Sequence, residues 1–357
     1  MAWKECSNVR IVKREDIELV SSDICKVNHP DTIVCLEDSD FWEICFSDIL
    51  DMDNVELTTP QKRWSGIKSR FTEKLCRFHH SWRVNSIIDL PLKGLWDKYD
   101  FVCNIEVGVK RWLFTDTSVR GYDRSALKKL REKHIKLHLL FLNPMISSRE
   151  TEYALQLVKE DYFDLVYTVD KDDASEYGFN FTNAVYSKRN ITNNHHCANW
   201  KVSYVGTAKN RLPELHAIAA IFEQMKSIFY INGVKREERC PLSNVIYNHA
   251  MDYAEVLRVV DMSDCIVEIL QKGQRGFTFR TYETICYNKK LITNNVDIKE
   301  CEFYNPRYIK IYSEIDDELI DFIEDNTMPD YQYDGRYSPV NLYNDILRRE
   351  RNEESYN

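Results

Sequence analysis

The sequence has little glycine and proline, with 10 and 9 among 357 residues. Such scarcity argues against collagen-like, linker-rich or low-complexity architecture. No apolar run approaches the roughly 20 residues that a membrane-spanning helix needs. The first residues, Met-Ala-Trp-Lys-Glu-Cys, lack the apolar core of a secretory signal. No Cys-x-x-Cys pair occurs among the 11 scattered cysteines, so we expect a cytoplasmic protein with reduced, mostly buried thiols.

A basic excess is also absent, since the net charge is -9 and the pI is about 5.6. This balance argues against a general nucleic-acid binder. Hydrophobic residues make up 43% of the chain, enough for a packed core. A length of 357 residues is too great for one ordinary domain and suits two.

Strand-like and helix-like segments alternate along the chain, which is typical of a parallel, doubly wound sheet. In the first half we expect strands at 32–36, 99–105, 138–142 and 165–169. Helices are expected at 62–77, 125–134 and 149–159, the second of them with Ser125 as N-cap. The same rhythm restarts after a polar stretch at 187–200. Strands are then expected at 202–206, 228–231, 264–269 and 291–293, and helices at 211–226, 253–260 and 337–351.

The most informative run is Gly273-Gln274-Arg275-Gly276-Phe277-Thr278-Phe279-Arg280-Thr281-Tyr282-Glu283. A glycine turn that opens a helix presents unpaired N–H groups and the positive end of the helix dipole, which suits a phosphate. We expect Gly276 and Thr278 to hold a diphosphate and Arg280 to assist. Glu283 would bind a ribose. The alternative is an ordinary loop in which Arg280 and Glu283 form a surface pair.

A second turn, Gly206-Thr207-Ala208-Lys209-Asn210-Arg211, also follows a strand. Lys209 and Arg211 would neutralise the same diphosphate, and arginine offers a bidentate contact. A solvated helix start is the alternative. The central expectation is that the two turns meet at one pyrophosphate.

Together these motifs resemble bacterial lipopolysaccharide-core and capsular-polysaccharide glycosyltransferases of the GT-B type. The resemblance covers roughly residues 75–350 and is more distinctive in the second half. Residues 1–60 lie outside it, and Leu142-Asn143-Pro144 replaces an aromatic-Asp pair that relatives often show. The matching positions are Gly206-x-x-Lys209-x-Arg211, Gln274-x-Gly276-Phe277-Thr278-x-Arg280-x-x-Glu283, Lys289-Lys290-Leu291-Ile292-Thr293-x-Asn295, His80-Ser81-x-x-x-Asn85 and Val169-Asp170-x-x-Asp173.

The resemblance implies an α/β protein with two Rossmann-like domains facing across a cleft. The expected units are an acceptor-side domain at 1–190, a nucleotide-sugar-binding domain at 200–335, and a C-terminal helix and tail at 336–357 that can return to the first domain. The implied activity transfers a sugar from a nucleoside-diphosphate-sugar donor to a glycan or glycolipid acceptor of the cell envelope, without a cofactor or a bound metal. Donor-binding residues implied by the match are Gly206, Lys209, Arg211, Gln274, Gly276, Phe277, Thr278, Arg280 and Glu283.

Acceptor-side chemistry is assigned to His80, Asn85, Asp170 and Asp173. His80 is the candidate base because histidine titrates near neutral pH, with a hydrogen-bonded structural histidine as the alternative. Asp170 and Asp173 could bind sugar hydroxyls, or could cap the helix that follows them. Lys209 and Arg211 complete the candidate catalytic set by stabilising the leaving group.

Three further hypotheses remain open. A non-catalytic nucleotide- or glycan-binding protein of the same fold would explain the missing aromatic-Asp pair. A metal-dependent GT-A enzyme would use Asp38 and Asp40, because hard cations prefer oxygen ligands. The basic cluster from Lys62 to Arg70 predicts either a solvated helix face or a peripheral contact with the inner membrane surface.

Overall fold

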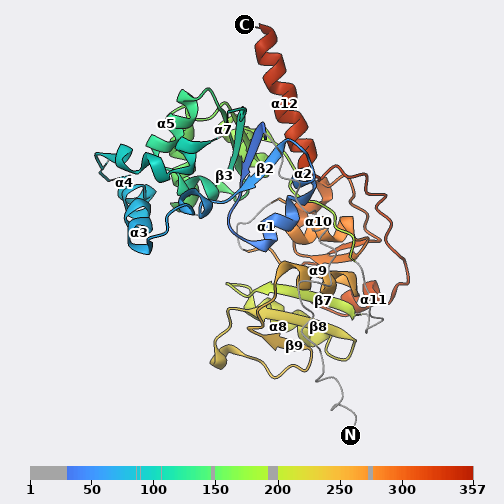
Figure 1. Ribbon diagram of the computed structural model, residues 1–357. Coiled ribbons are helices and arrows are strands. Elements are labelled where there is room, and N and C mark those ends of the chain that lie inside the picture. Colours follow the sequence, from blue (N-terminus) through green and yellow to red (C-terminus); the bar gives the residue numbers. More distant parts are fainter. Residues whose placement is uncertain are drawn as a thin grey trace.

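The computed structural model describes residues 30–356, except 86, 89, 106, 146–148, 192–199 and 272–275. Gly273 and Gln274 of the glycine turn therefore lie outside the described residues. Within the described part, the chain folds into two parallel six-stranded sheets, one in each half, and Figure 1 shows them as separate layers.

The N-terminal sheet has the strand order β2-β1-β3-β4-β5-β6, and every pairing is parallel. Its strands are short and mostly buried, as expected for a sheet that helices cover on both faces. They are β1 (Thr32–Cys35), β2 (Val55–Thr58), β3 (Arg111–Thr115), β4 (Lys136–Phe141), β5 (Leu165–Thr168) and β6 (Asn180–Phe181). The helices of this half are α1 (Asp40–Cys45), α2 (Ser47–Leu50), α3 (Arg70–His79), α4 (Trp82–Asn85), α5 (Arg124–Glu132), α6 (Arg149–Lys159) and α7 (Lys171–Tyr177).

The C-terminal sheet has the order β12-β11-β10-β7-β8-β9, again fully parallel. Counted from β7, this is the 3-2-1-4-5-6 order of dinucleotide-binding sheets, with the order reversing between β7 and β10. The strands are β7 (Trp200–Thr207), β8 (Ser227–Asn232), β9 (Val245–Tyr247), β10 (Ser263–Glu268), β11 (Lys290–Thr293) and β12 (Ile309–Ile311). The helices are α8 (Leu212–Ile221), α9 (Tyr253–Asp261), α10 (Phe279–Cys286) and α11 (Glu318–Glu324).

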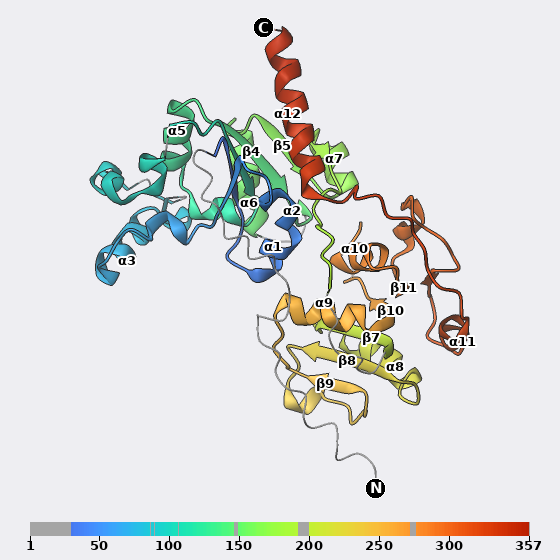
Figure 2. The same cartoon turned by 45° about the vertical axis from the view of Figure 1, so that its right-hand side comes forward.

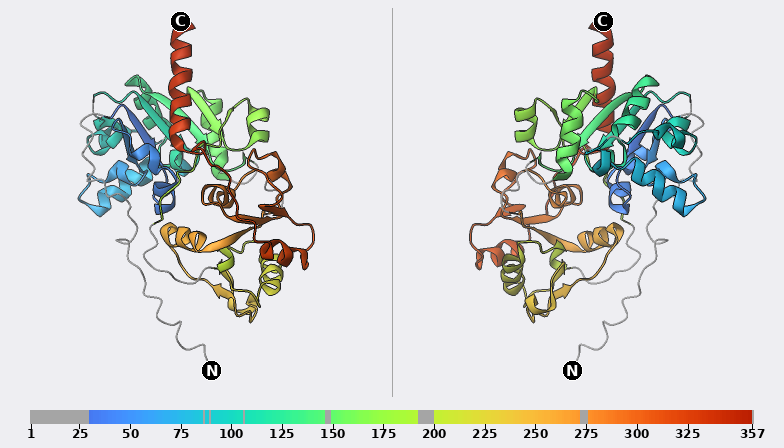
Figure 3. Two further views of the ribbon diagram at one scale, coloured as in Figure 1. Left: turned by 90° about the vertical axis from the view of Figure 1, so that its right-hand side faces the viewer. Right: turned by 90° about the vertical axis from the view of Figure 1, so that its left-hand side faces the viewer.

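The final helix, α12 (Pro339–Tyr356), runs along the N-terminal half, as Figure 3 shows. Glu350 on this helix accepts a hydrogen bond from Arg111 and contacts Nε2 of His138 at 3.0 Å. Tyr343 accepts a hydrogen bond of 2.7 Å from Asn54. These contacts show the return of the C-terminal helix to the N-terminal half.

Three expectations about local structure are wrong. The helix expected at 62–77 is a 3₁₀ turn at Lys62–Trp64 followed, after a break, by α3 at Arg70–His79. Residues 99–105 form 3₁₀ turns (Lys93–Tyr99 and Phe101–Asn104) rather than a strand, because Asp100 caps the second turn by accepting a hydrogen bond from the Val102 N–H. The strand that follows is β3, which the sequence analysis did not predict. Helix α5 begins after Asp123 instead of Ser125.

The cysteines behave as core residues. Eight of them are described, all are free, and six are buried. Cys265 and Cys286 lie in the core of the C-terminal half as expected. Within the described residues, we find no helix that is long and apolar enough to cross a lipid bilayer.

Candidate functional site

The two glycine turns of the C-terminal half meet at adjacent strand ends. β7 and β10 are paired neighbours in the sheet, so the turns that follow them start side by side. Two arginines connect the strand ends. Arg280 donates to the Val205 carbonyl at 2.7 Å, and Arg211 donates to the carbonyls of Thr207, at 2.6 Å, and Ile269. The described parts of the two turns therefore start from neighbouring strands, at the point where the strand order reverses, and their shared pyrophosphate stays a prediction.

The first turn leaves one cation in solvent. Lys209 is exposed and has a left-handed backbone with φ 45°, and it makes no hydrogen bond or ion pair with any described residue. Arg211 is half-buried and occupies the N-cap position of α8 without a side-chain capping bond. Its guanidinium already donates hydrogen bonds to the backbone carbonyls named above. Gly206 lies so close to Tyr204 that an added Cβ would come within 2.6 Å of the tyrosine oxygen. Lys209 is thus the side chain of this turn best placed to meet an anion.

In the second turn, Gly276 has φ 77°, a conformation that glycine adopts without strain. Its carbonyl accepts a hydrogen bond of 2.8 Å from Asn295. Thr278 N-caps α10 by accepting from the Arg280 N–H at 3.1 Å, and its hydroxyl donates to Glu268. Thr278 therefore already accepts from the N–H groups of Arg280 and Thr281, and the positive end of the α10 dipole lies at the strand edge.

The carboxylate of Glu283 is buried inside the protein and bonded to other side chains. Its side chain is 0% exposed, paired with Arg280, and accepts a hydrogen bond of 2.8 Å from the Tyr253 hydroxyl. The alternative of a surface Arg280–Glu283 pair is corrected, because the glutamate of the pair is fully buried. The Tyr253 hydroxyl also lies 3.1 Å from the hydroxyl of Tyr186 in the N-terminal half, so this pair belongs to the contact between the halves.

A pocket of about 180 Å³ lies between the two halves beside the second turn, and no residue of the first turn is among its lining residues. The N-terminal half contributes Val169, Asp170 and Phe181, and the C-terminal half contributes Gly276 and Phe277. Carboxylates dominate the polar lining, which also includes Asp172, Asp297 and Glu300, with Lys171 as the cation. The cleft expected between two Rossmann-like halves is therefore present, and Gly276 and Phe277 line it.

Asp170 and Asp173 serve local structure. Asp170 N-caps α7 and accepts from the N–H groups of Asp172 and Asp173 at 2.8 and 3.0 Å. Asp173 is buried and accepts from the Met145 N–H at 3.0 Å. These contacts are those of the capping alternative, although Asp170 also touches the pocket.

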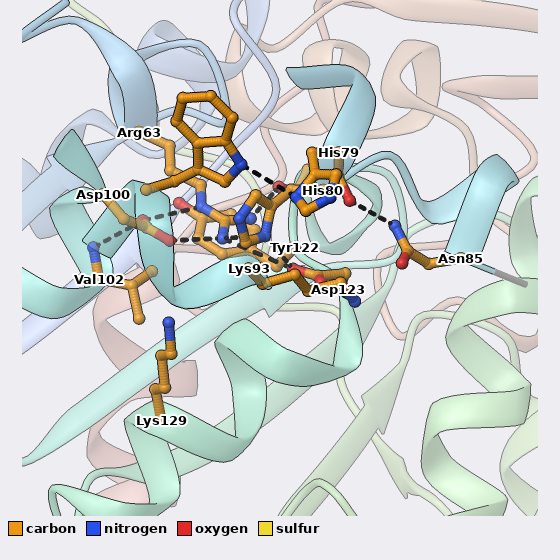
Figure 4. Close-up of polar contacts among 12 residues, drawn as sticks. Arg63, His79, His80, Asn85, Lys93, Asp100, Val102, Tyr122, Asp123 and Lys129 are labelled. Atoms are coloured by element: carbon orange, nitrogen blue, oxygen red, sulfur yellow. Dashed lines mark hydrogen bonds and ion pairs between the residues drawn. The ribbon is translucent and has the colours of Figure 1, made fainter. Parts of the chain in front are cut away.

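His80 and Asn85 lie elsewhere, in a region of the N-terminal half built around buried charges (Figure 4). His80 is 3% exposed, and its Nδ1 lies 2.9 Å from Asp123. Asn85 donates to the carbonyls of His79 and Ser81, both at 2.9 Å. Both residues therefore make the contacts of the structural alternative, and neither lines the pocket.

The buried charges around His80 form a network that the sequence analysis did not find. Arg63 donates two hydrogen bonds to Asp100, at 2.9 and 2.6 Å, and Lys93 lies 2.8 Å from Asp123. Arg63 is only 1% exposed, which corrects its place in a basic surface cluster. No local pattern marked these residues, because their partners lie 17 to 60 positions away in the sequence.

Asp40, the candidate metal ligand of the GT-A alternative, accepts a hydrogen bond of 2.7 Å from the Tyr253 N–H. It thereby joins α1 to the start of α9. Within the described residues, no group of three histidine, cysteine or acidic side chains is placed to hold a metal ion.

Comparison with known proteins supports the fold. No family model matches the chain, and no curated protein matches its sequence. Among solved structures, the sucrose-phosphate synthase of Thermosynechococcus elongatus is similar, with TM-score 0.50 and 10% identity, covering 92% of this chain and 100% of that chain. A UDP-N-acetylglucosamine 2-epimerase-like protein from Listeria monocytogenes has TM-score 0.49 and 8% identity, covering 88% and 95%. The glycosyltransferase SnogD from Streptomyces nogalater has TM-score 0.43 and 10% identity, covering 84% and 92%. The chain thus has an α/β, GT-B-like fold with two parallel six-stranded sheets.

Proposed function

We propose that the chain is a glycosyltransferase that moves a sugar from a nucleoside-diphosphate-sugar to a cell-envelope glycan or glycolipid. The supporting observation is the pair of turns at the ends of β7 and β10, where the order of a dinucleotide-type sheet reverses. Ligands of such sheets bind in the crevice at this reversal. The adjoining pocket reaches the N-terminal half, so a sugar attached to a diphosphate there would face the acceptor side.

Each side chain has a defined task in this proposal. Lys209 neutralises the diphosphate, and the positive end of the α10 dipole attracts its other oxygens. Arg211 and Arg280 hold the two strand ends together through carbonyls, so they position the site in addition to adding positive potential. Stabilising the leaving diphosphate in this way requires no metal ion.

Lys209→Ala tests the proposal most directly. Loss of one charge-assisted contact weakens donor binding by about 2 kcal/mol, roughly thirtyfold. Binding is measured by thermal stabilisation and calorimetry across a panel of nucleoside-diphosphate-sugars, followed by transfer assays with the sugar that binds. Lys226→Ala is the matched control. Lys226 is also exposed, but it directly precedes β8 and so lies at the N-terminal ends of the strands of the same sheet. Equal donor binding by the two variants would remove Lys209 from the site.

A second candidate function is favoured because side chains predicted to bind ligand are already hydrogen-bonded to protein atoms. Glu283, Arg280, Arg211 and His80 are all bonded to protein atoms. A nucleotide-sugar- or glycan-binding protein without catalysis fits that arrangement. Donor binding by the wild-type protein without transfer or donor hydrolysis, across a panel of glycan acceptors, would favour this function over the transferase.

A further inference from the structure

Exposed apolar side chains gather in one short part of the N-terminal half. Of the twelve large apolar side chains that are exposed among the described residues, seven lie between residues 71 and 95. Proteins rarely leave such side chains clustered in water unless the surface meets another phase or partner. We call this part of the chain, residues 70–98, the α3 segment. Its exposed apolar residues are Phe71, Leu75, Phe78, Ile87, Ile88, Leu92 and Leu95.

Helix α3 presents three of these side chains as one stripe. Phe71, Leu75 and Phe78 have the i, i+4, i+7 spacing that places residues on a single helix face. Phe71 is 73% exposed and Phe78 is 59% exposed. The opposite face carries Cys76, which is buried. This amphipathic helix therefore has its apolar stripe in solvent, the reverse of a helix that packs on a core.

Basic side chains accompany the stripe. Arg70 and Lys74 lie on the same helix and are exposed. The acidic residues of the segment that are described, Glu73 and Asp97, are half-buried and paired with Arg77 and Lys129. The segment is therefore locally cationic in a chain whose net charge is -9. The exposed basic residues within it and just before it are Lys62, Lys68, Arg70, Lys74, Arg83 and Lys98.

The buried charge network fastens the α3 segment to the N-terminal sheet (Figure 4). His80 ends α3, and Lys93 begins the 3₁₀ turn; both contact Asp123 at the start of α5. Trp96 donates to His79 at 2.9 Å, so the 3₁₀ turn also holds the end of α3. Figures 1 and 2 show α3 at the outer edge of the N-terminal half, away from the C-terminal sheet. The stripe is thus presented on a rigid base and does not face the other half.

We propose that the α3 segment docks the protein on a membrane rich in anionic phospholipid. An apolar helix face flanked by lysine and arginine lies in the lipid interface with the basic side chains against the headgroups. Charge complementarity selects this occupant, because the exposed rim of the stripe is basic. The proposal is independent of the transferase, since binding to lipid requires neither donor nor acceptor.

Co-sedimentation of the full chain with lipid vesicles tests this proposal. We expect at least tenfold tighter binding to vesicles of phosphatidylcholine with about 30% phosphatidylglycerol than to phosphatidylcholine alone, because each basic side chain near the anionic surface adds to the attraction. The preference should weaken as salt is raised from about 0.05 to 0.5 M, because the Debye length shortens. Equal binding to both kinds of vesicle, or no binding to either, would overturn the proposal.

The variant Phe71→Ser/Leu75→Ser/Phe78→Ser should lose at least tenfold in vesicle binding while its thermal unfolding is unchanged, because all three side chains are exposed. Val296→Ser/Met328→Ser is the matched control, since it removes exposed apolar side chains from the C-terminal half. A loss that the control shares, or no loss in the triple variant, would refute the α3 segment as the docking surface.

Charge is tested separately with Lys68→Gln, Arg70→Gln and Lys74→Gln. Each should weaken binding to anionic vesicles about fivefold and reduce its salt dependence. Lys226→Gln should leave binding unchanged. Light scattering of the wild type distinguishes a different occupant: self-association that the triple serine variant abolishes, without vesicle binding, would show that a second copy covers this face and would overturn the membrane proposal.

Discussion

In the N-terminal half, the buried carboxylates Asp100 and Asp123 are paired with Arg63, Lys93 and His80, whereas in the C-terminal half the buried Glu268 receives hydrogen bonds from three threonine hydroxyls. Burial alone raises the pKa of Asp123, but the hydrogen bond from His80 and the charge of Arg63 bring that pKa below its ordinary value. Burial raises the pKa of Glu268 above its ordinary value, and its threonine partners offset only part of the rise.

The two arrangements differ in which parts of the chain the buried carboxylates hold together. The N-terminal network ties a link of more than 50 residues between β2 and β3 to the sheet, and no strand occurs among the described residues of that link. Thr278, Thr281 and Thr293 come from the start of α10 and the end of β11, close to Glu268 on β10. A compact turn beside a candidate ligand site can therefore be held by neutral groups.

Arg63→Ala should produce the largest change in stability. It leaves Asp100 buried without its charged partner, which costs about 3–5 kcal/mol in the free energy of unfolding. Arg124→Ala provides the control, because Arg124 pairs with Glu160 at the surface and its loss costs at most about 1 kcal/mol. Urea unfolding measures both. Similar losses in the two variants would contradict a structural role of the network.

Tyr253→Phe tests the hydrogen bond between a tyrosine hydroxyl and the buried carboxylate of Glu283 in the C-terminal half. The hydroxyl donates to the carboxylate of Glu283, so its removal should cost about 2 kcal/mol. Tyr247→Phe removes a half-buried hydroxyl that bonds to the imidazole of His216 at 2.8 Å, and should cost about 1 kcal/mol. Urea unfolding of the two variants compares them. An undiminished stability of Tyr253→Phe would show that Arg280 alone satisfies Glu283.

Glu268→Gln tests how the stability contributed by the buried carboxylate of the C-terminal half depends on pH. Because the folded-state pKa of Glu268 is raised, its contribution to stability is present below the unfolded pKa and is lost as pH rises through the folded pKa. The variant should therefore gain stability relative to the wild type as pH rises from 5 to 8, by about 1.4 kcal/mol for each unit of the shift.

The stability contributed by the N-terminal network should depend on pH in the opposite direction. Since the folded-state pKa of Asp123 is lowered, its contribution is present above the unfolded pKa and is lost as pH falls through the folded pKa. Unfolding curves at pH 3 to 8 measure the two effects when Glu268→Gln and Asp123→Asn are each compared with the wild type. A Glu268→Gln variant whose stability tracks that of the wild type at every pH would refute the role of Glu268.

Asp170→Ala should give the smallest effect. Loss of the N-cap of α7 costs about 1 kcal/mol, and Asp252→Ala should cost the same at the start of α9 in the other half. Equal losses, measured by thermal unfolding, would show that helix caps contribute alike in both halves. A loss of donor or acceptor binding in Asp170→Ala alone would show that Asp170 also serves the pocket.

Local patterns in the sequence predicted most of the C-terminal half. The strands β7, β8, β10 and β11 and the helices α8 and α9 lie close to their expected ranges, because buried parallel strands appear as short apolar runs. The N-terminal half was harder to predict. β3 was missed, and residues 99–105 were taken for a strand, because an apolar run before a buried 3₁₀ turn resembles one.

The sequence by itself therefore determined the α/β class, the two sheets and the two glycine turns, since these depend on periodicity and local turn chemistry. Only the tertiary structure decided the partners of the charged side chains. Glu283 is bonded to Tyr253, 30 positions away, and Arg63 to Asp100, 37 positions away. It also decided that the stripe of α3 faces solvent, because an amphipathic pattern shows that a helix has an apolar face but not what that face contacts.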